Sequence, residues 1–113
     1  MPPRSQLSQT PPYAVESAIV TLGANLRTAR LRRNISLADM AAKIGVDRHV
    51  IADAERGKGT TGIAVYVGMM WAMNLLSHLD PVADPAADEE GLALDMADGR
   101  ERARFGGGMS NDF

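Results

Sequence analysis

The chain has 113 residues, a formal net charge of −2 and no cysteine. A chain of this length holds one small domain with a limited hydrophobic core, and the absence of cysteine excludes disulfides and thiolate chemistry. Because no charged N-terminal region leads into an apolar segment, we expect no signal peptide and a cytoplasmic protein.

The charge changes sign along the sequence. From Glu16 to Lys58 there are eight basic and five acidic residues, whereas from Asp80 to Phe113 there are nine acidic and three basic residues. A basic stretch is typical of domains that bind nucleic acid, while an acidic run is more often a solvated surface. We therefore predict a mildly basic domain followed by an acidic extension.

Residues 1–14 are predicted to form a flexible arm, because two Pro-Pro pairs and many polar residues leave this segment little to bury. A helix-turn-helix domain is predicted to follow over residues 15–79. Its first helix is expected at 15–33, where apolar residues recur at helical spacing. These apolar residues are Ile19, Leu22, Leu26 and Ala29.

The segment from Ser36 to Gly57 predicts two short helices joined by a tight turn. Ser36 can cap the first helix, and Gly45 can end it in the left-handed region. Asp47 can cap the second helix, which continues to Arg56. Two short helices that cross at a fixed angle are typical of a DNA-binding helix-turn-helix.

This segment resembles the phage repressor and Cro class of helix-turn-helix proteins, the XRE family. The residues that carry the resemblance are Arg30, Leu37, Ala41, Gly45, Val46, Ile51, Glu55, Arg56 and Gly57. The resemblance implies an all-α, lambda-repressor-like domain of five helices, with a structural ion pair between Arg30 and Glu55. It also implies a phosphate contact at Ser36. Leu37 departs from the family, which often has Gln there, and this removes one polar contact with DNA.

The second helix of the motif would be the recognition helix. On its outer face, Arg48 can donate two hydrogen bonds to guanine, His49 can donate to guanine or phosphate, and Ala52 can pack on a thymine methyl group. Asp53 would repel phosphates unless it accepts from cytosine, pairs with Arg48 or a neighbouring base-reading residue, or lies beyond the groove. The predicted DNA-binding residues are Ser36, Arg48, His49, Ala52, Asp53, Arg56 and Lys58.

Residues 63–76 form the most apolar stretch of the chain. This stretch is shorter than the roughly 20 residues that a membrane span requires, so no membrane association is expected. We predict instead a buried helix, with one apolar face closing the core and another meeting a second protomer. The predicted dimer-interface residues are Tyr66, Met69, Trp71 and Met73.

The acidic extension is predicted to cover residues 80–105 and to contain a short helix from Ala86 to Met96. After this helix, Arg100, Arg102 and Arg104 alternate with other residues, a period that permits an edge strand or an extended arm. Residues 106–113 are predicted to be a flexible tail.

The segment from Met70 to Leu94 carries a second resemblance. It contains Trp71-Ala72-Met73, then Asp84-Pro85, then Gly91-Leu92-Ala93-Leu94, and it looks like the corresponding part of HipB-type antitoxins. Those proteins are the DNA-binding partners of HipA-type kinases. The resemblance therefore implies a kinase toxin as partner and repression of the protein's own operon.

No catalytic, metal or cofactor site is predicted. The chain has two histidines and no cysteine, so neither a metal cage nor a nucleophile with its base can be assembled. We predict a homodimeric repressor that binds an inverted-repeat operator in double-stranded DNA, and no enzymatic activity. The alternative is a protein-interaction module that keeps the helix-turn-helix scaffold without reading DNA. Salt-dependent binding to duplex DNA separates the two.

Overall fold

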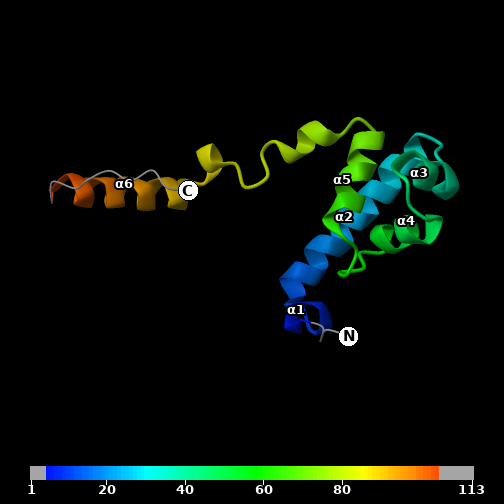
Figure 1. The fold of residues 1–113 in the computed structure, drawn as a ribbon, viewed down its shortest axis with the longest axis horizontal. Helices are drawn as coiled ribbons and strands as arrows, with labels where there is room; N and C mark the ends of the chain where they lie inside the picture. The colour runs from blue at the N-terminus through cyan, green and yellow to red at the C-terminus, as the bar shows by residue number, and fades with distance from the viewer. Residues whose placement is uncertain (1–4, 105–113) are drawn as a thin grey trace. The chain divides into compact units, whose positions relative to one another are not determined.

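The computed structural model describes residues 5–104, which contain helices and no strand (Figure 1). The chain divides after Ser77 into two compact units, here called the first unit (residues 1–77) and the second unit (residues 78–113). The all-α, lambda-repressor-like fold that the sequence predicts is thus present. Among the described residues, no helix is both long and apolar enough to cross a bilayer.

The first unit contains five α-helices, whose bounds are α1 Gln6–Gln9, α2 Tyr13–Arg32, α3 Leu37–Ile44, α4 Arg48–Glu55 and α5 Ile63–Ala72. A 3₁₀ turn, η1 at Leu76–Leu79, spans the division between the units. The second unit contains the 3₁₀ turn η2, Pro85–Ala87, and the helix α6, Glu89–Arg104.

Local signals set the bounds of the helix-turn-helix. The Ser36 hydroxyl accepts a hydrogen bond from the Asp39 amide at 3.0 Å and so caps α3. Gly45 ends α3 with φ 81°, in the left-handed region that glycine adopts without steric cost. Asp47 occupies the N-cap position of α4, but its side chain makes no capping hydrogen bond.

The core of the first unit is built between α2 and the end of α5. Its buried apolar residues are Leu26, Met40, Ala41, Ile51, Ala54, Tyr66, Met69, Met70 and Met73. Methionine supplies four of these residues, and its unbranched side chain fits the irregular spaces between short helices. Helices α2, α3 and α5 pack against α4 and leave one face of α4 outside the core.

The structure corrects the predicted dimer interface, because α5 buries one face rather than two. Tyr66, Met69, Met70 and Met73 follow the helical spacing of a single buried stripe, and Met69 is fully buried. Tyr66, Met69 and Met73 therefore belong to the core of the protomer. Of the four residues predicted for the dimer interface, Trp71 alone is exposed, with 55% of its surface accessible.

Three predicted elements differ from the structure. The arm contains the short helix α1, capped by the Ser5 hydroxyl, which accepts from the Ser8 amide. The helix predicted to run to residue 76 ends at Ala72, since Asn74 takes a φ of 61°. The fifth helix predicted at 86–96 begins instead at Glu89 and continues to Arg104, so residues 100–104 are helical and not extended. The predicted tail, 106–113, lies outside the described residues.

Gly23 allows α2 and α4 to approach closely. A Cβ atom built on Gly23 would lie 2.4 Å from the Ala54 carbonyl oxygen and 2.8 Å from that of Glu55. Both oxygens belong to the backbone, so relief requires the two helices to move apart. Gly23 therefore sets how closely α4 packs on α2.

We expect Gly23→Ala to lower the free energy of unfolding by about 1–3 kcal/mol, since overpacking outweighs the better helix propensity of alanine. Urea unfolding of the full chain measures this change. Gly59→Ala is the matched control, because a Cβ at Gly59 meets nothing within 4 Å. Equal stability of the two variants would contradict the close approach.

Candidate nucleic-acid interface

The outer face of α4 carries the residues predicted to read DNA. Ile51, Ala54 and Glu55 are buried on its inner face. Arg48 and His49 are exposed at its N-terminal end, and Ala52 and Asp53 are half-buried one turn later. The four predicted base-contacting positions thus lie on the face that the core leaves open.

A buried ion pair fixes the C-terminal end of α4 to α2. The Arg30 guanidinium donates to both carboxylate oxygens of Glu55, from Nε to Oε2 at 2.6 Å and from Nη2 to Oε1 at 2.9 Å. The Arg30 and Glu55 side chains are only 7% and 5% exposed. The hydrogen bond to Glu55 raises the pKa of Arg30, although burial opposes this shift. This is the ion pair that the family resemblance implies.

Arg30 makes a third hydrogen bond, to a second partner that the sequence does not indicate. Its Nη1 donates to the backbone carbonyl of Ile35 at 2.8 Å, in the segment between α2 and α3. One guanidinium therefore connects α2, the start of the helix-turn-helix and the end of α4. In the planar guanidinium group, donors point in fixed directions, so this contact set also fixes the relative orientation of the three segments.

Asp53 forms a charge cluster with two predicted DNA-binding residues. Its carboxylate pairs with Arg56 and, at 3.4 Å, with the Lys58 ammonium group. Burial would raise the pKa of Asp53, but hydrogen bonding and charge from Lys58 and Arg56 together lower it. The sequence allows Asp53 to pair with Arg48 or another base-reading residue, but in the structure its partners are Arg56 and Lys58, which follow it at the end of α4. The Arg56 and Lys58 side chains remain largely exposed beside it.

The loop after α4 is held in place by three contacts. Gly57 has φ 78°, and an added Cβ would lie 2.6 Å from the Val20 Cα atom of α2. The Lys58 amide donates to the Asp53 carbonyl at 3.0 Å, and its carbonyl accepts from the Tyr66 hydroxyl at 3.3 Å. Tyr66, predicted to meet a second protomer, thus anchors the loop that carries Lys58.

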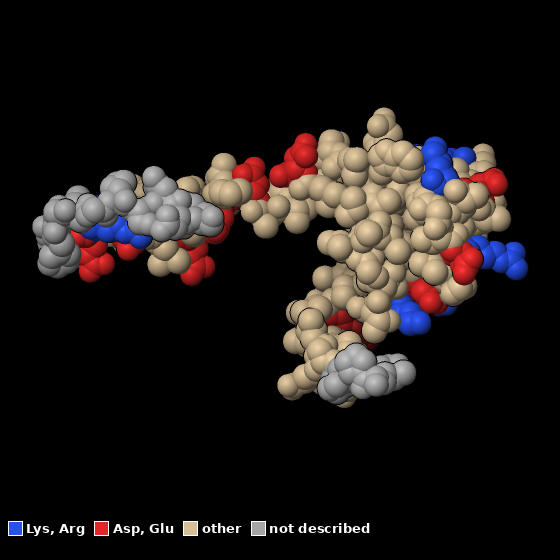
Figure 2. Space-filling model, in the orientation of Figure 1, with Lys and Arg blue, Asp and Glu red and all other residues tan. Residues whose placement is uncertain are grey.

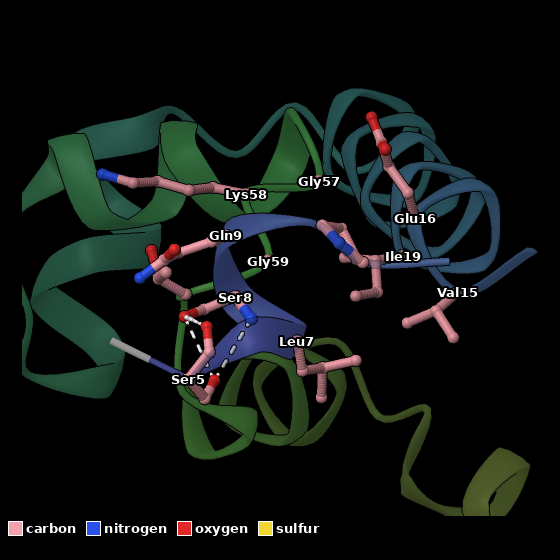
Figure 3. Close-up of a pocket in the computed structure, with 12 residues that line it drawn as sticks. Ser5, Leu7, Ser8, Gln9, Val15, Glu16, Ile19, Gly57, Lys58 and Gly59 are labelled. Atoms are coloured by element: carbon pink, nitrogen blue, oxygen red, sulfur yellow. Dashed lines mark hydrogen bonds between the residues drawn. The ribbon is translucent and has the colours of Figure 1, made fainter. Parts of the chain in front are cut away.

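A groove lies beside this loop, between α1, the start of α2 and residues 57–60 (Figure 3). Ser5 and Ser8 of α1 hydrogen-bond to each other along it. Among the described residues of its lining, Glu16 and Lys58 are the charged ones, and the others are aliphatic, hydroxyl-bearing or glycine, apart from Gln9. The arm and the loop that carries Lys58 therefore lie on two sides of the same groove.

Ser36 is exposed at the start of α3. Its oxygen already accepts the capping hydrogen bond, but its hydroxyl hydrogen can still be donated to a phosphate oxygen. Figure 2 shows Lys and Arg side chains distributed with acidic ones over the α3 and α4 side of the first unit. Within residues 5–104, no group of three or more His, Asp or Glu residues is arranged to hold a metal ion.

Residues 26–66 match a family model described as helix-turn-helix. The match runs from the second half of α2 into α5 and contains every predicted DNA-binding residue. No curated protein and no solved structure matches the chain. The family match supports the XRE-type resemblance and a DNA-binding transcription regulator, a class that is typically not enzymatic.

We expect Glu55→Gln to destabilise the protein by about 3–5 kcal/mol, because it leaves the buried charge of Arg30 without its counter-ion. Thermal or urea unfolding measures the loss. The double variant Arg30→Met with Glu55→Leu removes both charges and should recover a large part of the stability. A loss below about 1 kcal/mol for Glu55→Gln would contradict the prediction, because it would mean that the pair contributes no more than an exposed surface ion pair.

We expect Asp53→Asn to strengthen binding to nonspecific duplex DNA and to steepen its salt dependence, because Arg56 and Lys58 lose their counter-ion and can pair with phosphates. Fluorescence anisotropy at several salt concentrations measures both quantities. Asp98→Asn changes the net charge by the same amount in the second unit and is the control. An unchanged salt slope for Asp53→Asn would show that Arg56 and Lys58 do not contact DNA phosphates.

Proposed function

We propose that this protein is a sequence-specific DNA-binding repressor whose recognition helix is α4. The observation that carries the proposal is the division of α4 into two faces. The inner face is fixed by the core and by Glu55, while the outer face exposes Arg48 and His49. A rigid helix that presents a cation and an imidazole at its N-terminal end suits entry into the major groove.

We expect some of the residues around this face to contact bases and others to contact phosphates. Arg48 would donate two hydrogen bonds to guanine, and His49 to guanine or a phosphate, while Ala52 would pack against a thymine methyl group. Ser36, Arg56 and Lys58 would contact phosphates and so set the register of the protein on the duplex. Asp53 would keep Arg56 and Lys58 in position and lower the affinity for DNA of any sequence.

We propose that the repressor acts as a homodimer on an inverted repeat. The exposed large apolar residues of α5 are Ile63 and Trp71, and these two residues can contact a second protomer. A symmetric dimer presents two recognition helices about 34 Å apart, one turn of DNA, so the half-sites should repeat at that spacing or a multiple of it. Sedimentation of the full chain with and without Trp71→Ser tests whether Trp71 contacts the second protomer.

A finer proposal is that the protein is the antitoxin of a HipBA-like pair. It is supported by the resemblance of residues 70–94 to HipB-type antitoxins and by the excess of acidic residues in the second unit, which favours contact with protein over contact with DNA. A HipA-type kinase encoded next to this gene should co-purify with the full chain and not with a chain ending at Pro85. Retention of the kinase by the shortened chain would place docking on the first unit.

The second candidate is an interaction module that does not read DNA. Two observations favour it. Leu37 stands where the XRE family often has Gln, and Asp53 neutralises part of the positive charge beside α4. Binding to duplex DNA that weakens steeply with salt supports the repressor. Absence of binding at low salt supports the interaction module.

We expect Arg48→Ala to weaken operator binding and to relax the base preference at one position of each half-site, because a bidentate arginine discriminates for guanine by about 1–3 kcal/mol. Selection from a randomised duplex pool with each protein measures the preference. Arg27→Ala, which removes an exposed arginine of α2 outside the predicted set, is the control. Identical base preferences for Arg48→Ala and the unchanged protein would show that Arg48 does not read a base.

A further inference from the structure

The loop between α4 and α5 is rich in glycine. It runs from Gly57 to Gly62, and three of these six residues are glycine. Glycine has more backbone freedom than any other residue, so a loop of this composition samples many conformations unless other contacts restrain it. Lys58, a predicted DNA-binding residue, lies in this loop. The position of Lys58 therefore depends on the contacts that hold its backbone.

The backbone carbonyl of Lys58 accepts two hydrogen bonds. One comes from the Thr61 amide at 3.0 Å, within the loop, and the other comes from the Tyr66 hydroxyl of α5 at 3.3 Å. Tyr66 lies on the buried stripe of α5 and is 6% exposed. The second hydrogen bond therefore joins the Lys58 peptide group to the core of the first unit.

Two different helices thus hold the two ends of Lys58. Its carbonyl is bonded to Tyr66 of α5, while its ammonium group lies 3.4 Å from the Asp53 carboxylate of α4. The Lys58 side chain is nevertheless 57% exposed, so its ammonium group can reach a phosphate. A lysine whose backbone is already fixed loses less conformational entropy when it makes that contact.

We propose that Tyr66 is a positioning residue for DNA binding, whose hydroxyl holds the Lys58 backbone so that the Lys58 ammonium group meets the DNA phosphates beside α4. The inference rests on the proposed DNA-binding function. Tyr66 is too buried to touch DNA itself and acts through Lys58. A phosphate contact carries no sequence information. Tyr66 therefore affects the affinity for DNA and its salt dependence, and leaves the base preference unchanged.

The test begins with Tyr66→Phe, which removes the hydroxyl group alone. The ring keeps its place in the core, and the Lys58 carbonyl keeps the Thr61 amide as a donor, so no buried polar group loses its last partner. Helix content and the midpoint of thermal unfolding should therefore stay close to those of the unchanged protein. Affinity for duplex DNA should fall by about twofold to tenfold, the range that one hydrogen bond supports. The salt slope should become shallower, by up to about one phosphate contact.

A double-variant cycle with Lys58→Gln separates positioning from a general structural effect. If Tyr66 acts through Lys58, adding Tyr66→Phe to Lys58→Gln should cause no further loss of affinity and no further change of the salt slope. Selection from a randomised duplex pool should give Tyr66→Phe the base preference of the unchanged protein. A displaced α4 would instead alter the base preference and lower the affinity in both backgrounds.

A measurement without DNA tests the contact between Tyr66 and the loop by itself. In NMR relaxation of the isotope-labelled full chain, Tyr66→Phe should lower the order parameters of the Gly59 and Thr60 amides. The amides of α4 should keep their order parameters, because the substitution leaves the core packing of that helix in place. Equal order parameters for the loop in both proteins would overturn the inference.

Tyr13→Phe is the matched control, because it removes the same atom from a tyrosine that is 83% exposed. It should leave DNA binding unchanged. Equal affinity and salt slope for Tyr66→Phe and the unchanged protein, additive losses in the cycle, or an altered base preference would each overturn the inference and leave the repressor proposal standing. Absence of salt-dependent DNA binding by the unchanged protein would overturn the repressor proposal, and the inference with it.

Discussion

The arrangement of the first unit depends on the buried contact between Arg30 and Glu55. Two hydrogen bonds join these side chains, and a third runs from Arg30 to the Ile35 carbonyl. Removing either charge leaves the other in a low-dielectric site, so the two residues constrain each other strongly. The value of the contact lies in geometry, because it orients α4 against α2 while the outer face of α4 stays free.

Backbone packing and the ion pair act on the same region of α4. Gly23 brings α2 against the carbonyl groups of Ala54 and Glu55, and Gly57 brings the following loop against Val20. The loop is then anchored by the Tyr66 hydroxyl. The exposed cations Arg56 and Lys58 therefore project from a segment whose backbone is held on both sides. A preorganised segment loses less conformational entropy when it binds.

Much of the helix-turn-helix could be predicted from the sequence, because local chemistry determines it. The Ser36 cap, the left-handed Gly45 and the spacing of Met40, Ala41 and Ile51 each depend on residues close in the chain. The buried face of α5 could not be predicted in this way. Almost every residue from Ile63 to Ala72 is apolar, so periodicity does not distinguish the face that α2, α3 and α4 cover. For this reason the sequence predicts Tyr66, Met69 and Met73 at a dimer interface, although they lie in the core of the protomer.

The other differences also come from contacts that a sequence pattern does not contain. Alternating arginines at 100–104 fit a strand as well as a helix, and the ion pair between Asp98 and Arg102 favours the helix. The candidate site shows the same limit. Spacing placed Arg48, His49, Ala52 and Asp53 on one face of α4, but the pairing of Asp53 with Arg56 and Lys58 depends on how the chain leaves that helix.

The central claim is that DNA binds to the outer face of α4. Its most direct test is a titration of the isotope-labelled full chain with its selected duplex, followed by amide chemical shifts. We expect the largest changes at Arg48, His49 and Ala52, with smaller ones at Ser36 and Lys58 and none along the buried stripe of α5. Changes confined to α5 or α6, with α4 unaffected, would contradict it.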